Sequence, residues 1–203
     1  MGAAQIDLPL RIRPGSGSLE NGAVPLFAIL GPAILVLAVF GWNVAEYRFL
    51  GDDAFISFRY AKHLVDGHGL VWNPGEPVEG YTNFLWVLLM ASSMWFGLPV
   101  EVVSQWIGIA SGACVIAMVL WAGLRSMTWK SPLIWVAPLA LASSRTFTAW
   151  STGGLETMFF VLVVYLAYWC FFHERRRDIS APFASSLLFA AAALTRPEGN
   201  LFA

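Results

Sequence analysis

Long apolar stretches without charged side chains, separated by short polar segments, dominate the order of residues along the chain. Residues 23–42 carry no charge, and a helix of about 20 apolar residues spans the hydrocarbon core of a bilayer. Pro32 lies in the first half of this stretch, where a transmembrane helix tolerates a kink. Further apolar stretches follow at residues 84–98, 102–124, 133–143, 158–172 and 179–194. The pattern predicts an all-α membrane protein, a polytopic bundle of transmembrane helices.

The basic residues indicate which of these stretches cross the membrane. If every stretch crosses and the N-terminal tail is inside, the basic run at residues 175–177 lies outside, against the positive-inside rule. Residues 84–98 are short for a crossing, and as a re-entrant or interfacial helix they leave Arg125, Lys130 and the basic run in the cytoplasm. We therefore predict five crossings. One of them, 133–143, is long enough only if it extends to Trp150.

The division of the chain follows from this pattern. Residues 1–22 are largely polar and lack the cleavage site of a secretory signal, so we expect a disordered cytoplasmic tail. Residues 23–203 form the predicted transmembrane core, in which residues 43–98 supply an outer loop and juxtamembrane helices. Because the chain ends within an apolar segment after Gly199, we expect it to be the N-terminal portion of a longer protein.

An amphipathic helix is predicted in the first outer loop. Apolar and polar side chains between residues 53 and 66 alternate with the period of a helix. The apolar face carries Ala54, Phe55, Phe58, Ala61 and Val65, and the polar face carries Arg59, Lys62, His63 and Asp66. We expect this helix to lie along the membrane surface and to end at the glycines on either side of His68.

Composition supports the membrane class and excludes others. Apolar residues make up 58% of the chain and charged residues 12%, with a mean hydropathy of +0.64, whereas about a quarter of a soluble domain is charged. The formal net charge is −1 and there is no basic stripe, which argues against nucleic-acid binding. Cys114 and Cys170 lie within apolar stretches, so we expect them to be packing residues.

Two adjacent carboxylates, Asp52 and Asp53, precede the amphipathic helix. Aspartate is a favoured N-cap residue, and an acid in the first turn complements the helix dipole. A carboxylate at a membrane surface can instead act as the general base for an acceptor hydroxyl, helped by a low dielectric and a neighbouring charge that shift its pKa. The two roles are compatible, with one for each Asp.

The prediction places three polar segments on the same outer side, namely residues 43–83, residues 145–157 and the segment that begins at Thr195. Two further acids occur in these segments. Glu79 is either a solvated loop carboxylate or, with Tyr81 and Asn83 close by, a ligand for a sugar hydroxyl or a divalent cation. Its oxygen ligands favour Mg, Mn or Ca. Glu156 is either a first-turn acid after a glycine N-cap or a functional acid at the membrane boundary. The paired glycines before Glu156 also permit a ligand to approach the backbone.

Basic and aromatic residues of the outer segments complete the candidate site. Arg196 either extends its basic group to the interface or binds a phosphate through its planar guanidinium, and Arg145 poses the same choice. Trp72 and Tyr81 lie in a polar loop, where we expect them to contact a sugar. Asn83, at the end of the same loop, is a further predicted substrate-binding residue. His68 is either an interfacial polar residue or a ligand contact from its turn between two glycines.

Four motifs in these segments resemble polytopic glycosyltransferases of the GT-C class. They are DDAFISFRY at 52–60, GLVWNPGEPVEGYTN at 69–83, GGLET at 153–157 and LTRPEG at 194–199. The resemblance is to bacterial cell-wall arabinofuranosyltransferases and, more distantly, to protein mannosyltransferases and lipid A aminoarabinose transferases. It covers most of residues 24–203.

This resemblance implies transfer of a sugar from a polyprenyl-phosphate donor to a glycan, lipid or protein acceptor of the cell envelope. The reaction would take place on the outer face of the bacterial inner membrane. The resemblance also implies that Asp52 or Asp53 is the base, that Glu79 and Glu156 lie around the site, and that Arg196 lies near the donor phosphate. A polyprenyl phosphate is already a good leaving group, so no nucleotide site is required.

Two other classes of protein remain as alternatives. A transporter or lipid flippase would carry paired broken helices with polar residues near the middle of the bilayer, a pattern that the nearly charge-free stretches do not show. A non-catalytic scaffold would tolerate substitution of the polar loop residues. The enzymatic hypothesis requires Asp52, Glu79 and Glu156 to meet in one pocket at the outer rim of the membrane.

Overall fold

The structure is a computed structural model that describes residues 26–76, 78–177 and 183–202, so the predicted tail at 1–22 lies outside the described residues. The elements in this part of the chain are helices, which confirms the predicted all-α class. They are α1 (Leu26–Tyr47), α2 (Ala54–Val65), α3 (Phe84–Trp95), α4 (Val100–Ser126), η1 (Pro132–Trp135), α5 (Val136–Ser143), α6 (Arg145–Thr152), α7 (Thr157–Arg176), α8 (Phe183–Thr195) and η2 (Pro197–Leu201).

Three of the described helices, α1, α4 and α7, are long and apolar enough to cross a membrane. Large apolar side chains point away from the protein on these helices, among them Phe27 at 79% and Trp106 at 61% exposure. Such exposure is costly in water and normal against lipid tails. The chain is therefore a membrane protein. Shorter apolar helices at Phe84–Trp95, Pro132–Ser143 and Phe183–Thr195 accompany the long ones.

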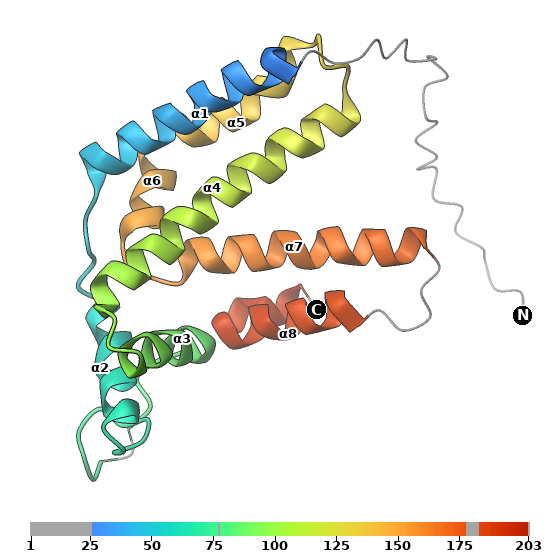
Figure 1. The fold of residues 1–203 in the computed structure, drawn as a ribbon. Helices are drawn as coiled ribbons and strands as arrows, with labels where there is room; N and C mark the ends of the chain where they lie inside the picture. The colour runs from blue at the N-terminus through green and yellow to red at the C-terminus, as the bar shows by residue number, and fades with distance from the viewer. Residues whose placement is uncertain (1–25, 77, 178–182, 203) are drawn as a thin grey trace, which may run out of the picture.

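The helices connect two ends of the molecule (Figure 1). We call the end where α2 and α3 lie the α2–α3 end; α1 finishes there, and α4 and α7 begin there. At the opposite end, named the basic end, α4 and α7 finish. Arg125 lies in the last turn of α4 and is followed by Lys130, and residues 175–177 lie at the end of α7. The chain reaches the α2–α3 end through α1 and leaves it through α4, so α3 does not connect the two ends. This path agrees with the predicted non-crossing helix, whose relation to the membrane stays a prediction.

The continuous helix from residue 133 to Trp150, which a crossing by this segment alone would need, does not form. The chain breaks at Ser144, which has an extended backbone with ψ 115° and caps α6 by accepting a hydrogen bond from the Phe147 amide at 3.2 Å. The side-chain amide of Asn43 on α1 donates to the Ala142 carbonyl at 2.8 Å, and so satisfies an acceptor that the end of α5 leaves open. The segment thus joins the two ends of the molecule through η1 and α5, followed by α6.

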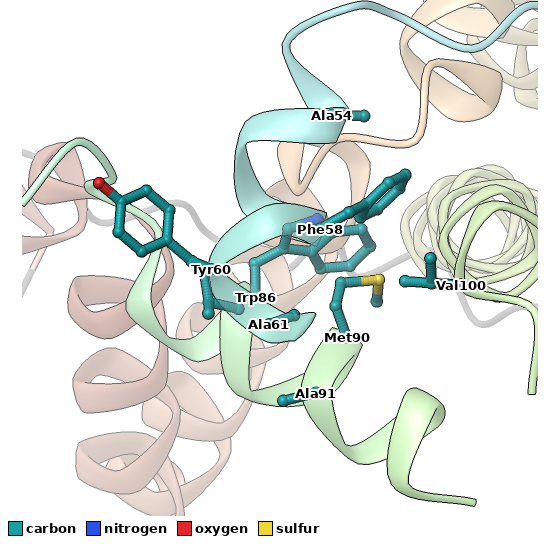
Figure 2. Packing of buried hydrophobic residues seen from close by; sticks show 9 residues of the cluster. Ala54, Phe58, Tyr60, Ala61, Trp86, Met90, Ala91 and Val100 are labelled. Atoms are coloured by element: carbon teal, nitrogen blue, oxygen red, sulfur yellow. The ribbon is translucent and has the colours of Figure 1, made fainter. Parts of the chain in front are cut away.

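An apolar core joins α2 to α3 (Figure 2). Phe58 and Ala61 of α2 pack with Trp86 and Met90 of α3, and all four are buried. The prediction placed Phe55 on the apolar face, but its side chain is 49% exposed. The buried face of α2 therefore rests on protein, and the membrane-surface position of this helix stays a prediction.

Candidate functional site

Hydrogen bonds between distant segments hold the α2–α3 end together. The Gly51 amide donates to the Gly153 carbonyl at 2.9 Å. Gln105 of α4, which is buried, donates from its side chain to the carbonyls of Phe49 at 2.8 Å and Thr152 at 3.0 Å. Because the acidic pair follows Gly51 directly, these bonds hold it beside the segment that leads into α7.

The paired glycines before α7 let this segment pack closely against the residues that precede α2 and against α4. Gly154 has φ +79°, and a Cβ at this position would lie 2.4 Å from Leu50 Cδ1 and 3.3 Å from Ser104 Oγ. Protein atoms therefore occupy the space that the sequence left open for a ligand. The predicted glycine N-cap is wrong, because Gly153 ends α6 and Glu156 holds the N-cap position of α7.

A cavity of about 440 Å³, lined by both polar and apolar side chains, opens at the α2–α3 end. Its walls come from α2, the residues before α3, α6, the start of α7 and the residues after α8. The side chains that matter for chemistry are Asp53, Tyr81, Asn83, Trp150, Glu156 and Arg196. Each of the three outer segments that the sequence predicted to lie on one side contributes to this cavity.

A network of polar side chains forms one wall. The Asn83 side-chain amide donates to Glu156 Oε2 at 2.8 Å and to Ser57 Oγ at 2.9 Å, and all three residues are buried. Arg196 Nε lies 3.7 Å from Glu156 Oε1 and 3.5 Å from Glu198 Oε2. The guanidinium of Arg196 is therefore held between two carboxylates while its side chain keeps 34% exposure.

The structure separates the two adjacent aspartates. Both are exposed, but Asp53 lines the cavity and Asp52 is not among its lining residues. Asp53 holds the N-cap position of α2, yet its side chain makes no capping hydrogen bond. Its carboxylate is thus free of the structural role that its position suggested, and it faces the same space as Arg196.

The loop before α3 brings Tyr81 to the cavity and leaves Glu79 outside it. The buried hydroxyl of Tyr60 donates to the Val78 carbonyl and accepts from the Gly80 amide, both at 2.8 Å. Burial, and then the charge of Glu79, raises the pKa of the Tyr81 hydroxyl. Glu79 is exposed and does not line the cavity, although its carboxylate acts on Tyr81 from nearby.

Two residues that the sequence offered as substrate contacts lie away from the cavity. Trp72 packs against Tyr60 with ring centroids 5.8 Å apart, and the guanidinium carbon of Arg59 lies 4.3 Å from its ring centroid. His68 is exposed, and its ring centroid is 5.9 Å from that of His63. Neither Trp72 nor His68 lines the cavity, so substrate binding by these two stays a prediction without support from this geometry.

Sequence reasoning missed several residues of the cavity, among them Trp150 and Ser57. Trp150 of α6 lines it with 46% exposure, whereas Trp72 was the tryptophan that the sequence singled out as a sugar contact. Ser57 lies on the buried face of α2. A serine three residues after Ala54, on a face that is otherwise apolar, was the signal that pointed to it.

The described residues contain no group of three or more His, Cys, Asp and Glu side chains that could hold a metal ion. Both carboxylate oxygens of Glu156 already face Asn83 or Arg196. The divalent cation predicted at Glu79 therefore has no ligand set in this part of the chain and stays a prediction.

The fold and the cavity define an all-α membrane protein with an acidic, partly open site at one end of its helices. Over 182 residues the chain is 29% identical to a protein of Mycobacterium tuberculosis named terminal beta-(1->2)-arabinofuranosyltransferase. The match covers 80% of this chain and spans only 28% of the relative's length. It supports a distant relationship to an arabinofuranosyltransferase. No family model and no solved structure matches the chain.

Proposed function

We propose that the chain is part of a GT-C type membrane glycosyltransferase that acts in cell-envelope synthesis. It transfers a sugar from a polyprenyl-phosphate donor to a glycan, lipid or protein acceptor. The observation that carries this proposal is the single cavity lined by Asp53, Glu156 and Arg196, which come from three separate segments. The name of the mycobacterial relative points to arabinofuranose as the sugar and to a glycan as the acceptor.

In the proposed reaction Asp53 is the general base. Its carboxylate takes the proton of the acceptor hydroxyl as the hydroxyl oxygen bonds to the anomeric carbon of the donor sugar. The bond between that carbon and the phosphate oxygen breaks, and the polyprenyl phosphate leaves with the electron pair. Arg196 stabilises the charge of the departing phosphate. Tyr81 and Trp150 line the same cavity and offer aromatic surface to a sugar ring.

The position of the cavity suits a lipid-linked donor. It lies at one end of helices whose apolar side chains face outward, so a membrane lipid can present its phosphate there. Two basic clusters, Arg125 with Lys130 and residues 175–177, lie close to the ends of α4 and α7 that are opposite the cavity, and such clusters next to membrane helices favour the cytoplasmic side. We therefore propose that the cavity faces the exterior of the inner membrane.

The adjacent aspartates provide the test and its matched control. In the full protein, Asp53→Asn is expected to lower the rate of sugar transfer by about 10²- to 10⁴-fold, as loss of a general base does. Asp52→Asn, one residue away and outside the cavity, is expected to keep most of the activity. The measurement is transfer of labelled sugar from a polyprenyl-phosphate donor by membranes that contain equal amounts of each variant.

Undiminished transfer by the Asp53→Asn protein would reject Asp53 as the base. Movement of the lipid donor across the membrane without any transfer would instead favour the flippase alternative. Equal membrane levels of the two variants show that insertion is intact.

A further inference from the structure

Asn83 sits where a helix cap is expected but does not act as one. It holds the N-cap position of α3, and asparagine is among the residues preferred there, yet its side chain makes no capping hydrogen bond. The side chain instead donates to Ser57 on α2 and to Glu156 at the start of α7. The amide therefore serves contacts between elements and not its own helix.

The amide has little left to offer a substrate. An asparagine NH₂ group has two hydrogens, and the two bonds to Ser57 and Glu156 take both of them. The residue is only 9% exposed. Direct sugar binding by the Asn83 amide, as the sequence predicted, would require it to give up a bond to a buried carboxylate.

Glu156 depends on this amide because its carboxylate is buried. A buried charge is costly unless it is hydrogen-bonded and paired. Asn83 occupies Oε2, which leaves Oε1 to face Arg196. The other charged groups around Glu156 are Glu198, which also approaches Arg196, and Asp53 on the same cavity. Without the amide, the orientation of Glu156 is no longer fixed, and Arg196 is pulled toward Glu198.

We propose that Asn83 is a positioning residue, which orients Glu156 and through it holds the Arg196 guanidinium toward the cavity for an anionic phosphate ligand. This inference rests on the proposed function, in which Arg196 meets the donor phosphate. It assigns Asn83 a role in phosphate recognition without contact to the phosphate.

Asn83→Asp tests the inference with almost no change in side-chain size. At neutral pH the variant places a second carboxylate against Glu156, so the hydrogen bond from residue 83 to Glu156 is lost. Sugar transfer is then expected to fall about 10- to 100-fold, as for the loss of a hydrogen bond to a charged group. As the pH falls, one of the two carboxylates takes up a proton and again donates to the other. The pH optimum of the variant is therefore expected below that of the wild type.

Asn73→Asp is the matched control, because it makes the same change in the loop before α3, outside the cavity lining. It is expected to keep the neutral-pH activity and the pH profile of the wild type. A loss of activity in Asn83→Asp that does not depend on pH would overturn the positioning role, and so would unchanged activity at neutral pH.

A double variant shows whether Asn83 acts through Arg196. Arg196→Gln alone is expected to lower transfer, and adding Asn83→Asp to it is expected to cost little more, because residues in one network are not additive. Multiplied losses would contradict the inference.

Binding of polyprenyl monophosphate, measured by native mass spectrometry, separates this inference from the proposed function. Weak binding by Asn83→Asp at neutral pH that recovers at lower pH supports the positioning role even if the wild type transfers no sugar. Lipid binding equal to the wild type at neutral pH overturns it, and no binding by the wild type overturns both.

Discussion

The pKa of the Tyr81 hydroxyl depends on the loop that borders the cavity. Burial raises its pKa above the ordinary value of 10.0, and the charges of Glu79 and Tyr60 raise it further. A tyrosine whose pKa is higher in the folded protein adds stability that is fully present below about pH 10 and is lost as the pH rises through the folded value. Because the charge of Glu79 acts on the Tyr81 hydroxyl, the Glu79 carboxylate lies near the cavity, although Glu79 is not one of the lining residues.

We expect Glu79→Gln to lower the pKa of Tyr81, because the variant removes a negative charge that opposes ionisation of the phenol. The measurement is an ultraviolet absorbance titration of the phenolate, compared with a Tyr81→Phe protein to isolate the signal of Tyr81. Glu76→Gln, another exposed acid of the same loop, is the control and should leave the titration unchanged. An unaltered Tyr81 titration in Glu79→Gln would mean that the two groups are farther apart than the structure has them.

For some single residues, the sequence could not predict which of two similar side chains faces the cavity. Asp52 and Asp53 are chemically identical neighbours, and only the start of α2 and its packing decide which of them faces the cavity. The sequence around Trp72 and Trp150 does not show which of the two tryptophans lines the cavity either. Trp72 lies in a polar loop but packs on Tyr60, whereas Trp150 borders the cavity from α6.

At the scale of elements, α4 and α6 pack so closely that only glycine fits between them. A Cβ on Gly108 would lie 2.4 Å from the Ser151 carbonyl oxygen, and one on Gly112 would lie 2.7 Å from Ser151 Oγ. The close approach places α6, with Trp150 at the cavity, against the middle of α4. Small residues that let backbones approach are a common basis of helix packing in membranes.

Gly108→Ala is expected to destabilise the protein by about 1–3 kcal/mol, the usual cost of overpacking, because a backbone carbonyl cannot move aside as a flexible side chain can. Gly123→Ala on the same helix is the matched control, since its Cβ would meet Ile134 at an ordinary 3.6 Å. Thermal unfolding in detergent compares the two variants with the wild type. Equal unfolding temperatures would show that α4 and α6 are less tightly packed than this geometry requires.

Elements that depend on local pattern were predictable, and those that depend on distant partners were not. The helices at α2 and α3 follow from apolar periodicity and from the glycines after Asp66, where Gly67 adopts φ +83°. The break at Ser144 comes directly after the apolar stretch 133–143, and the sequence alone does not show how the chain turns there. The break is accommodated because Asn43, 99 residues away from Ala142 in the sequence, binds the carbonyl at the end of α5.

At the scale of the whole molecule, the grouping of the outer segments was the strongest prediction from the sequence. The alternation of apolar stretches and the basic clusters placed residues 43–83, 145–157 and the segment after Thr195 on one side, and the structure brings all three to the α2–α3 end. The bond from Asn83 to Glu156 and the separation of Asp52 from the cavity depend on the angles at which α2, α3 and α7 meet. No periodicity in the chain encodes those angles.

The direction of the molecule in the membrane is the remaining prediction at this scale. Basic residues at Arg125, Lys130 and 175–177 favour the cytoplasm for their end, which puts the cavity outside. Single cysteines test this in a protein whose Cys114 and Cys170 are replaced by alanine. Thr82→Cys, at an exposed position of the cavity, is expected to react with a membrane-impermeant maleimide in intact spheroplasts. Arg176→Cys, exposed at the basic end, is expected to react only after permeabilisation.

Reaction of both cysteines after permeabilisation shows that each site is accessible and serves as the control. The reverse pattern, with position 176 labelled from outside, would turn the cavity toward the cytoplasm. A cytoplasmic cavity would meet soluble nucleotide-linked sugars as well as lipid-linked ones, and the reason to expect a polyprenyl-phosphate donor would then be lost even if Asp53 and Arg196 kept their geometry. The side of the membrane therefore decides the class of donor independently of the side chains that line the cavity.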